Sequence, residues 1–537
     1  MVETAAQTQT LSKQINHVLD VTSVFQRLTD DSCDFNALLE TASITSKEHI
    51  NSILALSAAL RITCMDHRVD VIALNINGAQ LLPLIKTKFG DAKISGSQLT
   101  ILFDHISINN EVDEFKKLLL PSVFDAIRHT IAATKVNSEL DKSTYLIGSF
   151  SFDCYDLFES LPKFDSEKDF PDYDFYLVDK LIQVNHQTNN SRIICKVFAG
   201  DNQQKIANDY QADLQSLDKE IHRVVTDSQV EQLNTSVDLA KQVNLNDDDY
   251  RNLVMSAKQN IINGDVFQLV VARHFTLACP DVMAAYMALR KSNPSPYMFY
   301  INTKDYQLFG ASPESAVKYS AATNRASVYP IAGTRARGKL ADGQIDFDLD
   351  ARIELELKSD LKETAEHSML VDLARNDIAR VCKPGSRKID RLMEVDRYSH
   401  VMHLVSKVSG ELNSELDALS AYQACMNMGT LTGAPKIKAS ELIRHYETDY
   451  RGVYGGATGY LNAFGDMDTA IVIRSALVKA GVATVSAGAG IVYDSQPDAE
   501  ALETTNKAAA VIAAIESTYS NNTNFEANQL SGEPANG

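Results

Sequence analysis

Residues 329–338 read Tyr-Pro-Ile-Ala-Gly-Thr-Arg-Ala-Arg-Gly, and they join an apolar run to a glycine-containing turn. The apolar run over 326–331 predicts a β-strand. Gly333 would let a ligand approach the main chain, and Thr334 offers a hydroxyl and an N–H group. The same pattern is also typical of an ordinary strand-to-loop turn. This stretch alone therefore marks a candidate binding site without naming its ligand.

A long helix-like run follows this turn and covers residues 346–381. Glu363 and Glu366 are three positions apart in it, which places both carboxylates on one helix face. Glu500 and Glu503 repeat this spacing at the start of a second apolar-periodic helix. If the two pairs faced each other they could hold Mg²⁺, which prefers carboxylate and water oxygens. Each pair is also compatible with a solvated surface or with a favourable helix N-terminus.

Four further features could contact an anion or take part in proton transfer. An arginine ends an apolar run, two glycines follow a predicted strand, a threonine begins a helix after a break, and a histidine lies in a strand-like run. These features are Arg474, Gly488-Ala489-Gly490, Thr430 and His403. A buried arginine needs an anionic partner, and bare backbone N–H groups can cradle one. The simpler alternatives are an edge-strand arginine, a plain turn and a core histidine.

Taken from the residues alone, these features favour a Mg²⁺ enzyme that acts on a small carboxylated substrate. A non-catalytic anion-binding regulator remains a competing class. Phosphoryl transfer is a third, weaker class, because no P-loop or kinase signature is present.

The overall composition excludes several partners. The chain has 537 residues with 51 Lys+Arg and 70 Asp+Glu, so its net charge is 51 − 70 = −19. Such a balance argues against a nucleic-acid partner and against an anionic membrane surface. The seven cysteines are scattered without a CxxC, and the N-terminus has no apolar segment typical of a signal peptide. We therefore expect a cytoplasmic protein.

The pattern along the chain divides it into zones. Short strand-like runs fill the first half, and helices and strands alternate in the second, so an α+β class is expected. The predicted zones are an N-terminal extension (1–19), a strand-rich region (20–200), a helical linker (201–246), a second mixed region (247–517) and a disordered tail (518–537).

Five motifs in this order resemble the chorismate-utilising enzyme family. They are Pro330-Ile-Ala-Gly-Thr-Arg335, Leu370-Val-Asp-Leu-Ala-Arg-Asn-Asp377, Gly429-Thr-Leu-Thr-Gly-Ala-Pro-Lys436, Tyr454-Gly-Gly-Ala-Thr-Gly-Tyr460 and Ala487-Gly-Ala-Gly-Ile-Val492. The resemblance covers about residues 20–517. It implies a large fold with β-sheets packed together and helices outside, in which 247–517 is the chorismate-binding catalytic region.

The resemblance also assigns roles to residues. It implies Mg²⁺-assisted loss of the chorismate C4 hydroxyl and attack of a nucleophile at C2. The implied substrate contacts are Gly333, Thr334, Tyr454, Arg474, Gly488, Ala489 and Gly490. The implied Mg²⁺ ligands are Glu366 and Glu503, with Glu363 and Glu500 in the same cluster. Catalytic roles fall on His403, which assists the later elimination, on Glu363 as general acid, and on Thr430.

Two positions discriminate between branches of the family. The aminodeoxychorismate branch has a nucleophilic lysine where this chain has Ala332, and a methyl group cannot attack. The water-adding isochorismate branch has a lysine base where this chain has Gln268. The resemblance therefore favours the branch in which ammonia attacks and pyruvate is eliminated to leave anthranilate. Those two other branches, and a non-catalytic chorismate- or tryptophan-binding regulator, are the alternatives.

Partners and an inhibitor are implied as well. No cysteine lies in the glycine-rich turn that a glutamine amidotransferase needs, so ammonia would come from a separate glutaminase subunit in a heterotetramer of two large and two small subunits. The family's site for inhibitory L-tryptophan is similar to segments containing Glu40, Thr41, Pro296, Tyr297 and Met298. That would make residues 20–200 a regulatory region, with Thr41 in place of the family's serine. Both segments could instead only pack the two regions together.

Overall fold

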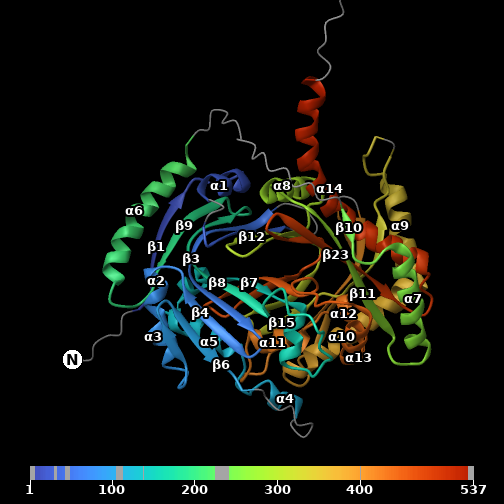
Figure 1. Cartoon of the computed structure of the whole chain (residues 1–537), viewed down its shortest axis with the longest axis horizontal. Coiled ribbons are helices and arrows are strands. Elements are labelled where there is room, and N and C mark those ends of the chain that lie inside the picture. The colour runs from blue at the N-terminus through green and yellow to red at the C-terminus, as the bar shows by residue number, and fades with distance from the viewer. Residues whose placement is uncertain are drawn as a thin grey trace, which may run out of the picture.

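A computed structural model describes residues 7–29, 33–42, 49–104, 113–136, 138–223, 241–340, 342–398 and 401–529, with side chains as far as residue 519. Within these ranges the chain forms antiparallel β-sheets at the centre with helices around them (Figure 1). This confirms the predicted α+β class. No helix of the described chain is long and apolar enough to cross a membrane.

One row of strands crosses the whole molecule. In pairing order it contains β1 (Gln9–Ile15), β9 (Asn190–Val197), β8 (Tyr173–Asn185), β3 (His49–Met65), β2 (Phe35–Ala42), β12 (Tyr297–Thr303), β13 (Gln307–Ser312), β22 (Ser475–Lys479), β23 (Val482–Ile491) and β11 (Gln268–Ala278). The short strands β10 (Gln242–Val243) and β19 (Gly433–Ala434) pair with β11. Every one of these pairings is antiparallel.

A second row branches from β8. It continues through β7 (Tyr145–Phe150), β20 (Ala457–Asn462), β21 (Met467–Ile471), β14 (Ser315–Ser320), β15 (Arg325–Val328) and β18 (Val401–Glu411), which also pairs with β16 (Ile331–Ala336) and β17 (Lys388–Arg397). The far half of β3 pairs with β4 (Arg68–Ala73), which leads to β6 (Gln98–Leu102) and β5 (Lys93–Ser95). The two rows therefore share β3 and β8.

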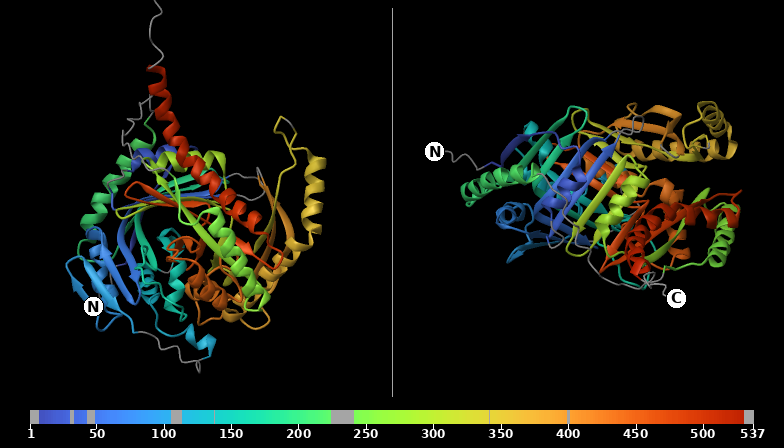
Figure 2. Two further views of the ribbon diagram at one scale, coloured as in Figure 1. Left: turned by 45° about the vertical axis from the view of Figure 1, so that its right-hand side comes forward. Right: turned by 90° about the horizontal axis from the view of Figure 1, so that it is seen from above.

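Helices flank these rows, as Figure 2 shows from two sides, and one of them, Ala418–Cys425, is almost wholly buried. They are α1 (Val21–Leu28), α2 (Ile76–Ala79), α3 (Leu81–Lys86), α4 (Glu114–Lys117), α5 (Asp125–Thr134), α6 (Gln203–Ile221), α7 (Asp247–Ile262), α8 (Val282–Ser292), α9 (Phe347–Ser359), α10 (Leu361–Val381), α11 (Ala418–Cys425), α12 (Gly429–Thr432), α13 (Lys436–Tyr446) and α14 (Pro497–Gln529). Short 3₁₀ turns cover Glu139–Ser143 and Phe152–Leu157.

The central strands are covered on both faces, so their side chains are buried almost continuously rather than alternately. All six residues of β7 are buried. Phe150 at its end stacks on Tyr422 of α11, with ring centroids 4.1 Å apart, and meets Phe175 of β8 edge-on. Residues of the first and second halves of the sequence thus meet in one core.

One detail of the predicted organisation needs correction. The helix expected over 346–381 is two helices, because Asp360 is extended and its carboxylate caps α10 by accepting from the N–H groups of Lys362 and Glu363. Helix α14 continues to Gln529, within the predicted tail, and residues 530–537 lie outside the described residues. Strand β1 lies in the predicted extension 1–19, and α6 lies in the segment 201–246 that is predicted to be a helical linker.

Candidate active site

The strand predicted over 326–331 is instead two strands, because β15 ends at Val328 and β16 begins at Ile331. Gly333 and Thr334, predicted to lie in a turn, lie within β16, next to a histidine of the neighbouring strand β18. The register between β16 and β18 shifts between Ile331 and Thr334, and Thr334 then pairs with His403. The Thr334 Oγ1 and His403 Nδ1 atoms are 2.8 Å apart. Gly333 has a φ of 86°, and a Cβ there would come within 3.2 Å of Glu363 Oε2. Only glycine fits this position without strain, so the main chain of β16 comes close to the side chain of Glu363 here.

His403 is neutral at physiological pH in this setting. Burial, together with the nearby guanidinium of Arg474, lowers its pKa to about 4. A neutral imidazole can accept a proton from a substrate carbon or hold a hydrogen bond. The simpler interpretation as a core histidine is therefore less apt, because a charged arginine and a predicted substrate-binding threonine are its neighbours.

The first acidic pair lies at the start of α10. Glu363 Oε1 accepts from Arg335 Nη1 at 2.7 Å, and Glu366 Oε1 accepts from Gln268 Nε2 of β11 at 2.8 Å. Burial raises the pKa of Glu366, and the charges of Glu363 and Glu503 raise it further. The effect of Glu503 on Glu366 shows that the acidic pair on α10 and the acidic pair on α14 are close enough to interact electrostatically.

The second acidic pair lies in the first turns of α14. Burial and the neighbouring Glu503 raise the pKa of Glu500, which is 3% exposed. Glu503 forms an ion pair with Lys507 at 2.6 Å, and Lys507 also donates to the Gly488 carbonyl at 2.8 Å. The described residues contain no ready-made cluster of three or more metal-binding side chains. The four carboxylates are therefore neighbours without forming a closed cage.

The glycine-rich segment of β23 exposes main chain without side chains beside these acids. A Cβ on Gly490 would come within 2.7 Å of Gln268 Nε2, and one on Gly488 within 3.3 Å of the Tyr454 hydroxyl. Ala489 lies between them in the strand and pairs with Val271 of β11. Gln268 is 1% exposed, and its Oε1 is buried without a hydrogen-bond partner. An orphaned acceptor of this kind costs free energy unless a ligand satisfies it.

Arg474 is held just before β22 with a φ of 51°, a conformation that non-glycine residues rarely adopt. Burial lowers its pKa, and the nearby Tyr454 and Glu503 oppose that shift. Its guanidinium makes no hydrogen bond to any residue the structure describes. A half-buried cation without a fixed partner is suited to a carboxylate, which a guanidinium can hold bidentately.

Glu314 is a functional candidate that the sequence pattern did not reveal. It lies between β13 and β14, is 7% exposed, and accepts from the Thr430 hydroxyl at 3.1 Å. Burial raises its pKa to about 8, so it is largely protonated at neutral pH and able to donate. The only signal in the sequence is one acid, in Ser312-Pro-Glu-Ser315, between two apolar strands. Thr430, predicted to be catalytic, thus contacts an acid.

Comparison with known proteins decides the family. The profile described as "chorismate binding enzyme" matches residues 96–513. The chain belongs to this family. Among curated relatives, anthranilate synthase component 1 of Vibrio parahaemolyticus is 44% identical over 98% of this chain and 96% of its own length, and that of Escherichia coli is 46% identical over 92% and 94%.

Solved structures of the chorismate-binding family agree with the fold. Anthranilate synthase component I of Streptococcus pneumoniae aligns with a TM-score of 0.63 and 29% identity, covering 86% of this chain and 92% of that one. The menaquinone-specific isochorismate synthase of Escherichia coli aligns with a TM-score of 0.65 over 95% of each chain. At 16% identity this second likeness concerns the fold alone.

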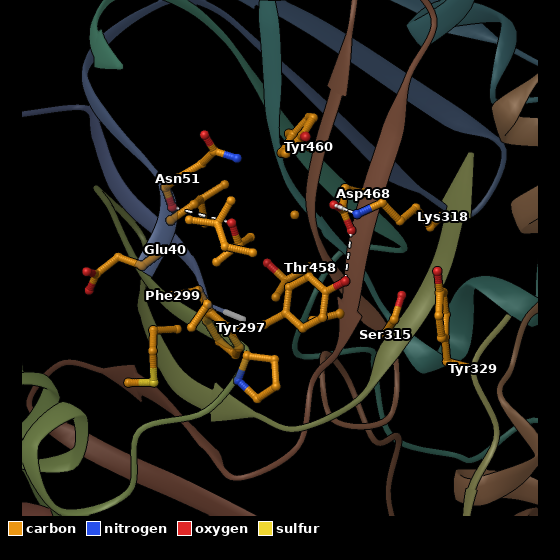
Figure 3. A pocket seen from close by; sticks show the side chains of 18 of the residues that line it. Glu40, Asn51, Tyr297, Phe299, Ser315, Lys318, Tyr329, Thr458, Tyr460 and Asp468 are labelled. Carbon is orange, nitrogen blue, oxygen red and sulfur yellow. Dashed lines mark hydrogen bonds and ion pairs between the residues drawn. The ribbon is translucent and has the colours of Figure 1, made fainter. Parts of the chain in front are cut away.

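A separate cavity of about 730 Å³ lies between β2, β12, β14 and β20–β21. All five residues predicted to bind tryptophan line it: Glu40, Thr41, Pro296, Tyr297 and Met298. Tyr297 donates to Asp468 at 3.0 Å, and Lys318 pairs with the same carboxylate (Figure 3). The predicted segments do pack the two regions together, since Thr41 pairs with Tyr297, but they also enclose space.

Glu40 has a structural role, unlike its neighbour Thr41 in β2, for which we expect a role in ligand binding. Figure 3 shows its carboxylate directed away from the middle of the cavity. There it accepts from Tyr286 and Arg290 of α8 at 2.7 Å. Glu40 is 1% exposed, so this ion pair fixes β2 against α8 rather than presenting a charge to a ligand.

Proposed function

We propose that this chain is the large subunit of an anthranilate synthase, which converts chorismate and ammonia to anthranilate and pyruvate. The observation that carries the choice of nucleophile is Gln268, whose Nε2 donates to Glu366 and lies beside the Gly490 backbone, while its Oε1 is buried without a hydrogen-bond partner. A neutral amide can accept an N–H of ammonia but cannot deprotonate water. Two relatives similar over almost their whole length carry the name of this enzyme.

The site residues divide the chemistry between them. Arg474, Tyr454 and the N–H groups around Gly488 bind the substrate carboxylates. Protonated Glu314, held by Thr430, gives its proton to the C4 hydroxyl, which leaves as water while ammonia adds at C2, and the ammonium so formed returns one proton to the Glu314 carboxylate. Neutral His403, oriented by Thr334, then takes the C2 proton as the C3–O bond to the enolpyruvyl group breaks, and the released enolpyruvate takes a proton from solvent at its methylene carbon to become pyruvate. This assignment moves the general-acid role from Glu363, which is bound by Arg335, to Glu314.

The acidic pairs fit a divalent cation of the Mg²⁺ type. Four carboxylates share one field, and two of them have raised pKa values that a cation would relieve. The residues that would hold it are Glu366 and Glu503, with Glu363 and Glu500 beside them. When bound, Mg²⁺ would neutralise a substrate carboxylate. Because no closed cage exists among the described residues, substrate oxygens are expected to complete the coordination.

The first test is turnover by the purified chain. With chorismate, Mg²⁺ and a high concentration of ammonium at mildly alkaline pH, we expect anthranilate, seen by its fluorescence, and one pyruvate for each anthranilate. Isochorismate or aminodeoxychorismate as the product would refute the proposal. Binding of chorismate without any turnover would favour the alternative of a non-catalytic regulator.

A separate glutaminase subunit is part of the proposal. A glutaminase needs a reactive thiolate, and thiolates form where the thiol is partly exposed and near positive charge. Five of the seven cysteines are buried. Burial raises the pKa of Cys64, Cys154 and Cys425, which makes these thiols unreactive. We propose a cytoplasmic heterotetramer of two such large subunits and two glutaminase subunits.

Feedback inhibition by tryptophan is proposed for the cavity of about 730 Å³. Its wall includes Ile331 and Val405, which pair with each other across β16 and β18. Thr334 and His403 lie on the same two strands, on the far side of the register shift. A ligand that repositions this strand pair would therefore alter the Thr334–His403 contact, and inhibition is the expected result.

Thr41→Arg is expected to abolish inhibition by tryptophan while preserving turnover. The larger, charged side chain would occupy the cavity in which Thr41 and Tyr297 are cross-strand neighbours, and burying its charge beside an apolar indole is unfavourable. The inhibition constant should rise by at least about tenfold, corresponding to the roughly 1.4 kcal/mol of one decade. Ser12→Arg, which adds the same charge at an exposed position of β1, is the control. Equal inhibition of both variants would contradict the assignment.

A further inference from the structure

One buried hydroxyl group next to the proposed base has no role in the proposed reaction so far. Tyr398 is 7% exposed, and its Oη atom is buried without a hydrogen-bond partner among the residues that the structure describes. A buried hydroxyl without a partner costs free energy, and most buried polar groups of folded proteins have one. The hydroxyl of Tyr398 is therefore free to donate to a bound substrate.

The hairpin of β17 and β18 places Tyr398 beside His403. The main-chain N–H of Tyr398 donates to the Val401 carbonyl at 2.7 Å, two positions beyond the pairing of Asp396 with His403. Side chains two positions apart on a strand point to the same face, so Tyr398, Asp396 and His403 share one face of the hairpin. The rings of Tyr398 and His403 meet edge-on there, with their centroids 5.1 Å apart. The unpartnered hydroxyl thus belongs to the face that carries the proposed base.

The same hydroxyl lies within the electrostatic reach of the proposed general acid. Burial raises the pKa of Tyr398, and the carboxylates of Asp396 and Glu314 raise it further. The guanidinium of Arg391 opposes this shift without reversing it. The phenol therefore keeps its proton at neutral pH, so it can donate a hydrogen bond and cannot act as a second base.

We propose that Tyr398 is a further catalytic residue, whose hydroxyl donates a hydrogen bond to the C3 oxygen of the substrate as pyruvate is lost; the inference rests on the proposed function. Ring atom C3 lies between C4 and C2. Glu314 acts on the hydroxyl of C4, and His403 acts on the proton of C2. A donor that contacts His403 and is influenced by Glu314 is therefore placed for the oxygen on C3.

This hydrogen bond gains strength when charge develops on the C3 oxygen. His403 takes the C2 proton, the electrons of the C2–H bond form the C2–C3 double bond, and the C3–O bond breaks with its electron pair on oxygen. The leaving group is an enolate until solvent protonates its methylene carbon. A donor fixed at this oxygen stabilises the enolate more than the neutral ether oxygen, so it speeds the cleavage. Tyr398 itself keeps its proton throughout.

The variant Tyr398→Phe removes the hydroxyl and keeps the aromatic ring against His403. We expect the loss of pyruvate to slow by about 10²–10³-fold, the usual effect of removing one donor to a developing oxyanion. Addition of ammonia at C2 should proceed at the wild-type rate, so an aminated intermediate that still carries the enolpyruvyl group accumulates. Single-turnover reactions with excess enzyme, Mg²⁺ and saturating ammonium, quenched and separated by chromatography, measure both steps.

Thermal unfolding distinguishes a substrate contact from a structural hydroxyl. Removing an unpartnered hydroxyl should leave the melting temperature of Tyr398→Phe equal to or above that of the wild type. Tyr173→Phe is the matched control, because the Tyr173 hydroxyl is also in a buried residue but donates to the Val123 carbonyl at 2.7 Å. The control variant should melt at a lower temperature and carry out both chemical steps at the wild-type rate.

The outcomes separate this inference from the proposed function. A wild-type chain that never forms anthranilate refutes the function itself. A wild-type chain that turns over, together with loss of pyruvate at the wild-type rate in Tyr398→Phe, overturns the role of Tyr398. Equal slowing of both steps, or a melting temperature lowered as in Tyr173→Phe, also overturns it, because the hydroxyl would then support the fold. Slow loss of pyruvate with unchanged addition and stability supports the inference.

Discussion

Glu314→Gln is expected to lower kcat for anthranilate formation by about 10²–10⁴-fold, the usual contribution of a general acid. The amide has nearly the same shape and can still accept from Thr430, but it cannot give a proton to the leaving hydroxyl. The KM for chorismate should change little, because the carboxylate-binding groups are untouched. Steady-state kinetics with saturating ammonium measure this, and a kcat within a few-fold of the wild type would refute the assignment.

The wild-type pH profile gives an independent check on Glu314. Its pKa of about 8 means that the acid form dominates below pH 8 and is lost as the pH rises through that value. We therefore expect kcat to decline above about pH 8 in the wild type. Ammonium must be saturating as NH₃ at every pH, because the ammonia fraction itself rises with pH.

The same variant should be more stable than the wild type at neutral pH. A carboxyl group whose pKa is raised in the folded protein binds more protons folded than unfolded, so its contribution to stability falls as the pH rises from about 4.5 to 8. Replacing the Glu314 carboxyl group by an amide removes this pH-dependent loss of stability. Thermal unfolding at pH 8 should show a gain of about 1–4 kcal/mol, and little difference should remain at pH 4.

Glu366→Gln is expected to abolish turnover by weakening the binding of Mg²⁺. Burial raises the pKa of this residue, and its neighbours Glu363 and Glu503 concentrate negative charge around it. Removing one anionic ligand should lower Mg²⁺ affinity by at least about 100-fold. This is more than the loss usually seen when a residue that only hydrogen-bonds to a metal ligand is replaced. Titration calorimetry with Mg²⁺ in the presence of chorismate reports this directly, without relying on activity.

Two further variants make this test specific. Glu503→Gln should give the same loss, because α14 supplies the opposite ligand. Glu139→Gln removes a carboxylate that is 76% exposed and pairs with Lys142, far from the four acids in the sequence, so Mg²⁺ binding should not change. The fold should survive in all three, as circular dichroism would show. Unchanged Mg²⁺ affinity in Glu366→Gln would place the metal elsewhere.

Local sequence patterns predicted the secondary structure around the site better than they predicted which of these elements lie close together. The i, i+3 spacing correctly placed Glu363 with Glu366, and Glu500 with Glu503, on helices, because helical periodicity is a local property. Nothing local brings α10 and α14 together. That proximity depends on sheet pairings between distant segments, and in the sequence only the resemblance to a family implied it.

Two features of the site could not have been found from residue patterns. The pKa of Glu314 depends on its burial between β13, β14 and Thr430, whose hydroxyl reaches it from 116 positions away. The break at Asp360 was missed because the helical pattern of 346–381 continues through it, while the cap that separates the helices depends on a single residue. Both depend on tertiary contacts or backbone geometry that periodicity does not report.

The sharing of β3 and β8 between the two rows of strands has a consequence for how the chain is made. Strand β7, which borders β8, finds its other partner in β20, and Ser149 bonds Thr458 across a separation of 309 positions. At ribosomal rates of about 5–20 residues per second, that partner emerges roughly 15–60 s after β7. During this interval the early strands expose unpaired edges, which invite association with other chains. A nascent chain of this architecture is therefore exposed to association with other chains until most of its length has been synthesised.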